Sequence, residues 1–516
     1  MDLLQNLHLG FSVALKPINV LFCMIGAAGG TLVGILPGIG PITAIAMLLP
    51  LTFKMPAIGA LIMLSGIYYG AHHAGSTTAI MLNMPGEPTS VVICLDGHPM
   101  ARAGRAGPAL CISALGSFFA GCVSIVVIAG LSPLLAEVSM MFGPAEYFST
   151  IVMALVTASV LTNDKRLTTL SMAVFGLLLG CIGTDLTTGD ERYTFGVPAL
   201  TDGVNFVAIA VGLFAFTEVI MNVGFPARQM KITAKITGLF PTLKDLRASW
   251  KPVLRGTALG GFLGIFPGTG PLLSSFASYA MERQIAKDPT RFGQGAIEGV
   301  AGPESANNAA ALTHFIPMLT LGIPAGAAMA LMLGALQIQG ISPGPEVMTK
   351  YPDLFWGIVA SMWIGNMMLL VLNLPMIGIW IRVLRIPFRT LYPGILAFCC
   401  IGTFSVMSQP FDVRLAALAG FVGVFFKAMN CSPAPLVLAL VLAPLLEENF
   451  RRAMIISDGD ASVFITRPIS LAILLLTVAL AFMLSFQRGA FARLVSGSRA
   501  GAGGKPVEPA AEEGRP

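Results

Sequence analysis

Two segments of the chain combine proline and glycine in a pattern that breaks a helix and frees backbone groups for binding. Residues 26–41 read GAAGGTLVGILPGIGP, and residues 256–271 read GTALGGFLGIFPGTGP. Proline removes a backbone donor and glycine allows angles that a helix does not use, so each P-G-x-G-P predicts a helix break. A helix that restarts there would present unpaired N–H groups and its positive dipole end to an anion. The candidate residues of the two breaks are Pro37, Gly38, Gly40, Pro41, Pro267, Gly268, Thr269, Gly270 and Pro271.

Each break is followed by an apolar segment that carries uncharged polar side chains. The first reads GAHHAGSTTAIMLNMPGEP from Gly70, and the second reads GPESANNAAALTHFIPMLTLGIPAG from Gly302. Polar groups are expensive in lipid, so these should face an interior cavity, where they can bind Na⁺ or a carboxylate. The alternative is that they form hydrogen bonds between helices and serve packing alone. The candidates in these segments are Ser76, Thr77, Thr78, Asn83, Glu304, Ser305, Asn307, Asn308 and Pro324.

The spacing of the other reactive side chains argues against an enzyme and against a cofactor. His72 and His73 are adjacent, so on a helix they point about 100° apart, and no third metal ligand follows at helical spacing. The eight cysteines show no metal-ligand spacing. No nucleophile lies at workable spacing from a base, and no basic stripe with interleaved aromatic residues suggests nucleic-acid binding. We therefore expect no catalytic residues, no cofactor, no nucleic-acid partner and no metal other than Na⁺.

The composition predicts that these segments lie in a membrane. Of the 516 residues, 55% are hydrophobic and 11% are charged, and the mean hydropathy is +0.80. Soluble domains carry roughly 25% charged residues, and a bilayer-spanning helix needs about 20 apolar residues. The chain is long enough for about 10–12 transmembrane helices with short connections. We predict an all-α polytopic membrane protein embedded in a lipid bilayer.

The two P-G-x-G-P segments also indicate an internal duplication. Nine of the sixteen aligned positions are identical at an offset of 230 residues. In each copy, glycines at i, i+4 and i+8 lie along nearly one helix face, where a neighbouring helix can approach closely. We therefore predict two homologous, inverted repeats with broken or re-entrant helices. The expected divisions are a first repeat at 1–226, a basic cytoplasmic linker at 227–251, a second repeat at 252–487 and a disordered cytoplasmic tail at 488–516.

The charges of the connecting loops predict the orientation. Basic residues gather in 85–106, 163–166 and 227–251, whereas acidic residues dominate 133–146 and 187–203. Because cytoplasmic loops of membrane proteins are enriched in lysine and arginine, we place the first three loops in the cytoplasm and the other two outside. The basic segment after Gln487 places the C-terminus in the cytoplasm as well.

Four blocks of sequence resemble a known transporter family over essentially the whole chain. They are GILPGIGPITAIAMLLPLT from Gly34, YYGAHHAGSTTAIMLNMPGEPTSVVICLDGHPMARAGRAGPAL from Tyr68, GIFPGTGP from Gly264, and PESANNAAA through TLGIPAG from Pro303. The chain resembles the large membrane subunit of the tripartite tricarboxylate transporters. The resemblance implies a multi-pass protein of the bacterial inner membrane that takes up a tricarboxylate or other organic carboxylate with a Na⁺ or H⁺ gradient. It also implies two partners, a small four-span membrane subunit and a periplasmic solute-binding protein.

The sequence departs from the family pattern at three positions next to the candidate site. The family usually has an aromatic residue and two glycines, G-A-x-Y-G-G-S, where His73 and Ala74 stand here, and Ala325 follows Pro324 where a glycine is usual. These departures leave the general role in place but put a citrate-like substrate in doubt. An anion channel, or a single-component carrier without a binding protein, is the alternative function.

The loop charges generate a prediction about orientation. A cysteine placed within 230–250 should react with a membrane-impermeant thiol reagent only after the membrane is opened. A cysteine placed within 187–200 should react from the outside of intact cells. The native cysteines, which lie mostly inside apolar runs, provide the background, and labelling with the opposite sidedness would reverse the orientation.

Overall fold

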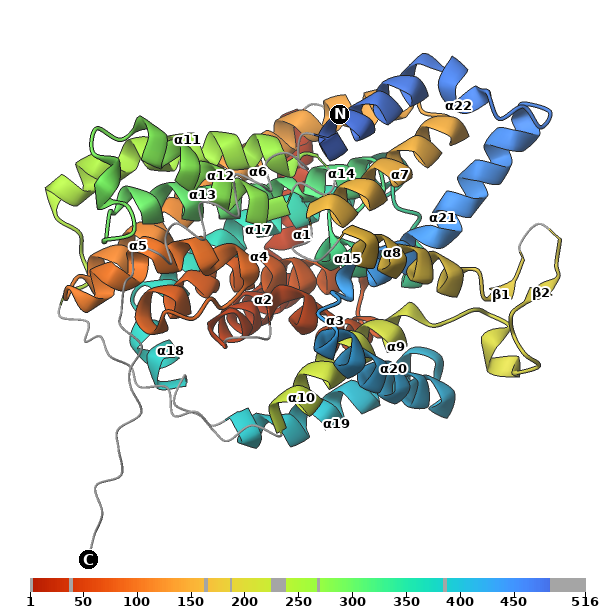
Figure 1. The fold of residues 1–516 in the computed structure, drawn as a ribbon, viewed down its shortest axis with the longest axis horizontal. Coiled ribbons are helices and arrows are strands. Elements are labelled where there is room, and N and C mark those ends of the chain that lie inside the picture. Colours follow the sequence, from red (N-terminus) through yellow and green to blue (C-terminus); the bar gives the residue numbers. More distant parts are fainter. Residues whose placement is uncertain are drawn as a thin grey trace, which may run out of the picture.

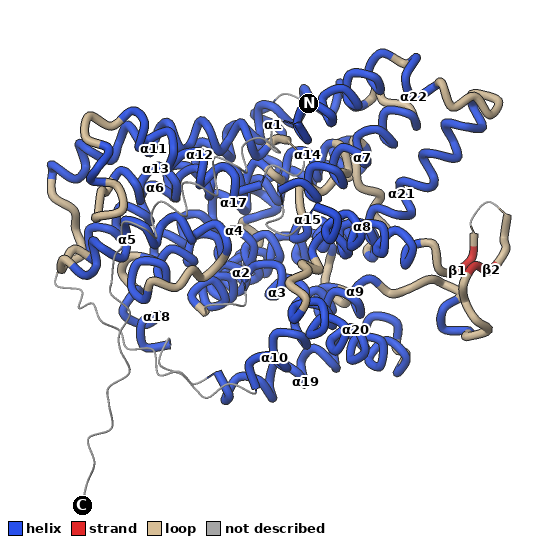
Figure 2. Tube along the Cα trace, viewed as in Figure 1, coloured by secondary structure: helices blue, strands red, loops and turns tan. Residues whose placement is uncertain are grey.

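The computed structural model describes residues 3–36, 40–161, 166–185, 188–223, 238–266, 270–383 and 388–482, and these residues are almost entirely helical (Figures 1 and 2). The strands found among them form one small antiparallel hairpin, β1 (Gly183–Thr184) with β2 (Glu191–Arg192). The all-α prediction is therefore confirmed for the described chain. Five candidate residues, the predicted tail 488–516 and part of the predicted linker 227–251 lie outside the described residues, which leave out Pro37, Gly38, Pro267, Gly268, Thr269, 224–237 and 483–516.

The helices form two groups along the chain, one before and one after the segment 224–237, which holds the start of the predicted linker. Those before it are α1 (Leu3–Ala14), α2 (Pro17–Ile35), α3 (Gly40–Thr52), α4 (Ala57–Leu82), η1 (Pro88–Ser90), α5 (Val91–Arg102), α6 (Ala106–Ser139), α7 (Pro144–Leu161), α8 (Arg166–Gly180), η2 (Pro198–Leu200), α9 (Phe206–Ala210), the π-helical η3 (Val211–Phe216) and α10 (Thr217–Val223). Those after it are α11 (Leu243–Gly264), α12 (Gly270–Ile285), η4 (Pro289–Arg291), α13 (Glu298–Thr313), α14 (Phe315–Thr320), α15 (Ala327–Ile338), α16 (Glu346–Lys350), α17 (Pro352–Asn373), α18 (Ile377–Val383), α19 (Phe388–Met407), α20 (Pro410–Ala428), α21 (Ala434–Ile456), α22 (Val463–Thr466) and a last helix, Pro468–Phe482.

Some segments that the sequence analysis treated as connections are helical. Helix α5 occupies most of the expected loop 85–106, and α11 begins within the expected linker 227–251. Thr242 caps α11 because its side chain accepts a hydrogen bond from the backbone N–H of Asp245, and the carboxylate of Asp245 reaches back to Thr242. This capping box satisfies two orphan N–H groups and lets a charged segment begin a helix.

Helices α4 and α13 form the centre of the molecule. Every residue of α4 from Gly59 to Met81 is buried, and so is every residue of α13 from Gly299 to Thr313. A helix that is buried on all sides needs neighbours on all sides. Helices α2, α5, α6 and α17 pack on α4, and α11 and α12 lie beside α13 (Figure 1). The two polar segments of the sequence are therefore interior.

The glycine faces allow the close helix contacts that the sequence predicts. A Cβ on the glycines of α2 would clash with backbone of α4, and a Cβ on the glycines of α11 would clash with backbone of α13. The contacts join Gly26, Gly30 and Gly34 to Met63, Ile67 and Ala71, and Gly256, Gly260 and Gly264 to Gly302, Ala306 and Ala310. The close approach is confirmed in both parts of the chain.

The outward surface is that of a membrane protein. On α20, Leu418, Phe421 and Phe425 are each more than 60% exposed, whereas Ala419 and Gly420 are buried against η3. Large apolar residues outside and small residues inside suit a helix that faces lipid. Among the described residues, three helices are long and apolar enough to cross a bilayer, Pro17–Ile35, Ala106–Val138 and Pro352–Asn373. The count of 10–12 crossings and the inverted order of the repeats stay predictions.

The glycine contacts generate a paired prediction. We expect Gly30→Ala and Gly260→Ala to lower stability by about 1–3 kcal/mol, because the new methyl group meets a backbone carbonyl that cannot move freely. The neighbouring Gly29 and Gly261 have nothing within 4 Å of an added Cβ. Alanine there should be neutral or stabilising by up to about 1 kcal/mol, because alanine favours a helix over glycine.

The thermal midpoint in detergent, followed by fluorescence-detected size exclusion, measures the difference. Equal midpoints for all four variants would contradict the assigned close helix approach.

Candidate anion-binding site

Helices α3 and α12 begin at the same cavity, which has a volume of about 700 Å³ and includes Gly40, Pro41, Gly270 and Pro271 in its lining. The backbone φ is 65° at Gly40 and 61° at Gly270, in the left-handed region that glycine reaches without a Cβ penalty. The first N–H groups of a helix have no partner within it and carry its positive dipole end. The fold therefore brings two helix N-termini, far apart in the sequence, to one cavity.

Two loops, several polar side chains and apolar residues line the rest of the cavity. The first loop, Pro85–Thr89, follows α4 and runs into η1, and the second, Ala325 and Gly326, directly precedes α15. His72, His314 and Tyr68 also line the cavity, and the hydroxyl of Tyr68 lies 3.2 Å from Nδ1 of His314. Among the described residues in this lining, Glu87 is the only acidic side chain, and neither lysine nor arginine is present.

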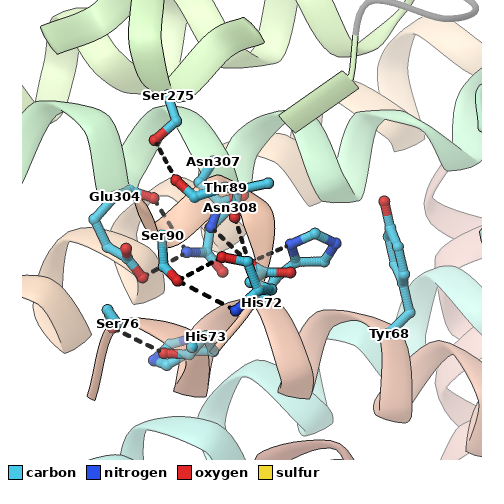
Figure 3. Close-up of polar contacts among 12 residues, drawn as sticks. Tyr68, His72, His73, Ser76, Thr89, Ser90, Ser275, Glu304, Asn307 and Asn308 are labelled. Carbon is cyan, nitrogen blue, oxygen red and sulfur yellow. Dashed lines mark hydrogen bonds and ion pairs between the residues drawn. The ribbon is translucent and has the colours of Figure 1, made fainter. Parts of the chain in front are cut away.

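Glu87 is held by three side chains from three different elements. Its Oε1 atom lies 2.7 Å from Nδ1 of His72, and it accepts hydrogen bonds from the hydroxyl of Thr89 and, at 3.2 Å, from Nδ2 of Asn307. Ser275 of α12 donates at 3.2 Å to the carbonyl oxygen of Thr89 (Figure 3). The loop that carries Glu87 is therefore tied to α4, α13 and α12.

Glu304 occupies a second buried polar cluster beside the first. Its Oε1 atom accepts hydrogen bonds of 3.1 Å from the hydroxyl of Ser117 and from Nδ2 of Asn308, and Asn308 also donates to Ser117 at 2.8 Å. The adjacent asparagines of α13 thus each donate to a different buried carboxyl group, Asn307 to Glu87 and Asn308 to Glu304. The Nδ2 groups of both asparagines are engaged by the protein itself, whereas Oδ1 of Asn307 is buried without a hydrogen-bond partner among the described residues.

The other predicted residues lie near the cavity without lining it. Ser76 contacts Ser113 with 2.8 Å between the hydroxyl oxygens, Thr78 donates to the carbonyl of Gly75, and Ser305 donates to the carbonyl of Ala301. Asn83 ends α4 in a left-handed conformation with φ 55°. Two further candidates are buried outside the lining. Thr77 lies within α4, and Pro324 lies directly before the lining residue Ala325.

Sequence reasoning missed several residues of this cavity. Glu87 was not selected, although a carboxylate inside the apolar segment MPGEPTS is a signal that could have marked it. His72 was considered only as a metal ligand, and His314 was not among the candidates. Their place in the cavity depends on contacts between α4, the following loop and α13, which spacing along the chain does not reveal.

The three departures from the family pattern occupy different places. Ala325 lines the cavity, so its methyl group occupies space at the cavity wall. His73 instead borders a separate small void with Asn308 and Asn366, and Ala74 packs in an apolar cluster with Trp380. Of the three, Ala325 is the departure in contact with the cavity.

Comparisons with known proteins agree with this architecture. Residues 20–438 match the model of the tripartite tricarboxylate transporter TctA family. An uncharacterized 52.8 kDa protein of the TAR-I ttuC' 3' region of Agrobacterium vitis is 54% identical over 479 residues, which are 93% of this chain and 95% of that protein. An uncharacterized protein of the TAR-II ttuC' 3' region of the same organism is 56% identical over 231 residues, 44% of this chain and 96% of its own.

No solved structure matches the chain. The family match covers most of the sequence and includes both helix breaks and both polar segments. The chain belongs to the tripartite tricarboxylate transporter TctA family, and it is a multi-pass membrane transporter subunit rather than an enzyme.

Proposed function

We propose that this chain is the permease subunit of a binding-protein-dependent secondary transporter in the bacterial inner membrane. It takes up an organic carboxylate, a tricarboxylate or a related anion, together with Na⁺ or H⁺. The observation that carries the proposal is the opening of two helix N-termini, at Gly40 and Gly270, on one cavity. Helix N-termini bind anions through free N–H groups and dipoles, and broken helices at a central site are typical of secondary transporters.

Matching contacts in the two parts of the chain support the internal-repeat form of this proposal. The glycine faces that align at an offset of 230 pack on partners that are 239 residues apart: Met63 and Gly302, Ile67 and Ala306, Ala71 and Ala310. Pro85, in the first lining loop, and Pro324, directly before the second, are also 239 residues apart. One pairing rule therefore relates both helix pairs and both loops, as expected for alternating access by two related halves.

The partners enter the proposal through the family. A small four-span membrane subunit and a periplasmic solute-binding protein would complete the transporter, the latter delivering the carboxylate to the outer side of the cavity. The cavity fits a small organic anion, since ligand sites of this kind measure about 300–1,000 Å³.

The helix starts generate the first transport prediction. We expect Gly40→Ala and Gly270→Ala to insert into the membrane near wild-type levels while carboxylate uptake falls at least about tenfold, or roughly 1.4 kcal/mol. An added Cβ meets no atom within 4 Å there, but it disfavours the positive φ that places the first N–H groups at the cavity. Uptake of radiolabelled carboxylates into proteoliposomes that contain all three subunits is the measurement.

Gly104→Ala is the matched control for backbone strain. Gly104 also has a positive φ, 77°, and open space around an added Cβ, but it lies between α5 and α6 and outside the cavity lining. This variant should change uptake no more than it changes expression. If Gly40→Ala and Gly270→Ala behave like Gly104→Ala, the helix starts do not form the anion site.

The partner proposal predicts that uptake collapses when the solute-binding protein is withheld from the same proteoliposomes. A receptor with high affinity concentrates scarce substrate at the permease, whose own cavity must release substrate and therefore binds it weakly. Full-rate uptake by the membrane subunits without the receptor would contradict the tripartite proposal. That result would favour an anion channel if flux is only downhill, or a single-component carrier if accumulation persists.

A further inference from the structure

We propose that Glu87 binds the cotransported cation, and that the anion enters the cavity only when this carboxyl group has been neutralised. The inference rests on the proposed function and assigns its coupling step to one side chain. It concerns a residue that lies in the loop between α4 and η1 and lines the same cavity as the two helix N-termini.

The geometry of Glu87 places a carboxylate on the cavity wall. Its contacts with His72, Thr89 and Asn307 all use Oε1, and its side chain also accepts a hydrogen bond from the backbone N–H of Ser90 in the capping box that starts η1. The side chain is 1% exposed, yet the residue borders the cavity, so its carboxylate is the acidic group that a ligand in the cavity meets. Carboxylate and hydroxyl oxygens suit Na⁺, and a carboxylate oxygen can equally take a proton. The shared chemistry is neutralisation of one carboxylate by one monovalent cation.

The position of Glu87 makes its charge matter for the anion. The N-termini of α3 and α12 attract a carboxylate into the cavity, whereas an ionised Glu87 on the same wall repels it. A cation on Glu87 removes this repulsion, so anion binding and cation binding favour each other. Such coupling is reciprocal, because each ligand must raise the affinity of the other by the same factor. The protein then mainly populates two states, one with an empty cavity and one in which both the cation and the anion are bound.

Other titratable groups lie near Glu87, and their contacts distinguish their roles from that of Glu87. His72 on α4 contacts Oε1 directly, and the Tyr68–His314 pair joins α4 to the end of α13 on the same cavity. Glu304 on α13 is close enough to interact with Glu87 electrostatically, but it does not line the cavity and is held by Ser117 and Asn308. Glu87 is therefore the carboxylate that the anion meets.

The experiment compares two transport modes in proteoliposomes with all three subunits. The probe is the radiolabelled carboxylate that wild type takes up fastest among citrate, succinate and acetate. One mode measures accumulation driven by a Na⁺ gradient at fixed pH or by a pH gradient without Na⁺. The other measures exchange of labelled for unlabelled probe at equal concentrations with no gradient.

Glu87→Gln is the decisive variant because glutamine keeps the size and one acceptor oxygen but is always neutral. We expect gradient-driven accumulation to fall at least tenfold, while exchange stays within about threefold of wild type and no longer depends on the cation. The gradient that ceases to drive uptake identifies the cation as Na⁺ or H⁺. Glu87→Gln that still accumulates the probe with a wild-type cation requirement would overturn the inference, and so would loss of exchange together with accumulation in a correctly folded variant.

Two further variants keep the test decisive. Asp412→Asn neutralises another buried carboxyl group, on α20, which accepts a hydrogen bond from Asn205 and lies outside the cavity lining; it should keep the wild-type cation requirement. Glu87→Asp keeps the charge but withdraws it from the cavity, so it should raise the cation concentration for half-maximal uptake at least threefold. If Glu87→Gln does not fold, an unchanged cation requirement in Glu87→Asp overturns the inference.

Failure of the proposed function looks different from failure of this inference. If the wild-type system takes up none of the carboxylates under any gradient, the proposed function itself is wrong. If wild type shows cation-driven uptake and Glu87→Gln shares its cation dependence, the function stands and the coupling site lies elsewhere.

Discussion

Close backbone contact between helices is the constraint on which the cavity depends. The glycine face of α2 lies directly on α4, and the last glycine of that face, Gly34, sits one turn before the first break. Gly86, in the loop that carries Glu87, packs so closely on Gly34 that a Cβ would clash with its carbonyl oxygen. The end of α2 and the Glu87 loop are therefore fixed to each other. Gly264 of α11 is fixed in the same way to Ala310 and Thr313 of α13.

Hydrogen bonds from the surrounding helices offset the free-energy cost of burying two carboxyl groups, Glu87 and Glu304. Burying an ionised carboxylate without partners is very costly, and two like charges in a protein interior repel each other. Asn307 and Asn308 each donate to one oxygen of one of these groups, and their side chains diverge because neighbouring helical residues point about 100° apart. The same α13 segment thus separates a cavity carboxylate, Glu87, from an interior one, Glu304.

Much of the fold followed from local sequence features. The glycine spacing predicted the close helix contacts, since positions four residues apart share one face of any helix. The P-G-x-G-P segments predicted where α2 and α11 end and where new helices start, and α3 and α12 do begin at Gly40 and Gly270. The segments 85–106 and 227–251 were less well described, because their charges and turn residues masked the helices α5 and α11.

By itself, the sequence determined that the chain is a helical membrane protein with two interrupted helices and polar residues in its interior. These properties depend on composition and on spacings of a few residues, which the backbone converts directly into helix faces and breaks. Tertiary structure alone decided that both breaks open on one cavity, that Asn307 and Asn308 serve protein carboxyl groups, and that His72, Glu87 and His314 line the wall. Those outcomes depend on distances between residues that are up to about 240 positions apart in the sequence, and only the packing of α4 and α13 at the centre sets such distances.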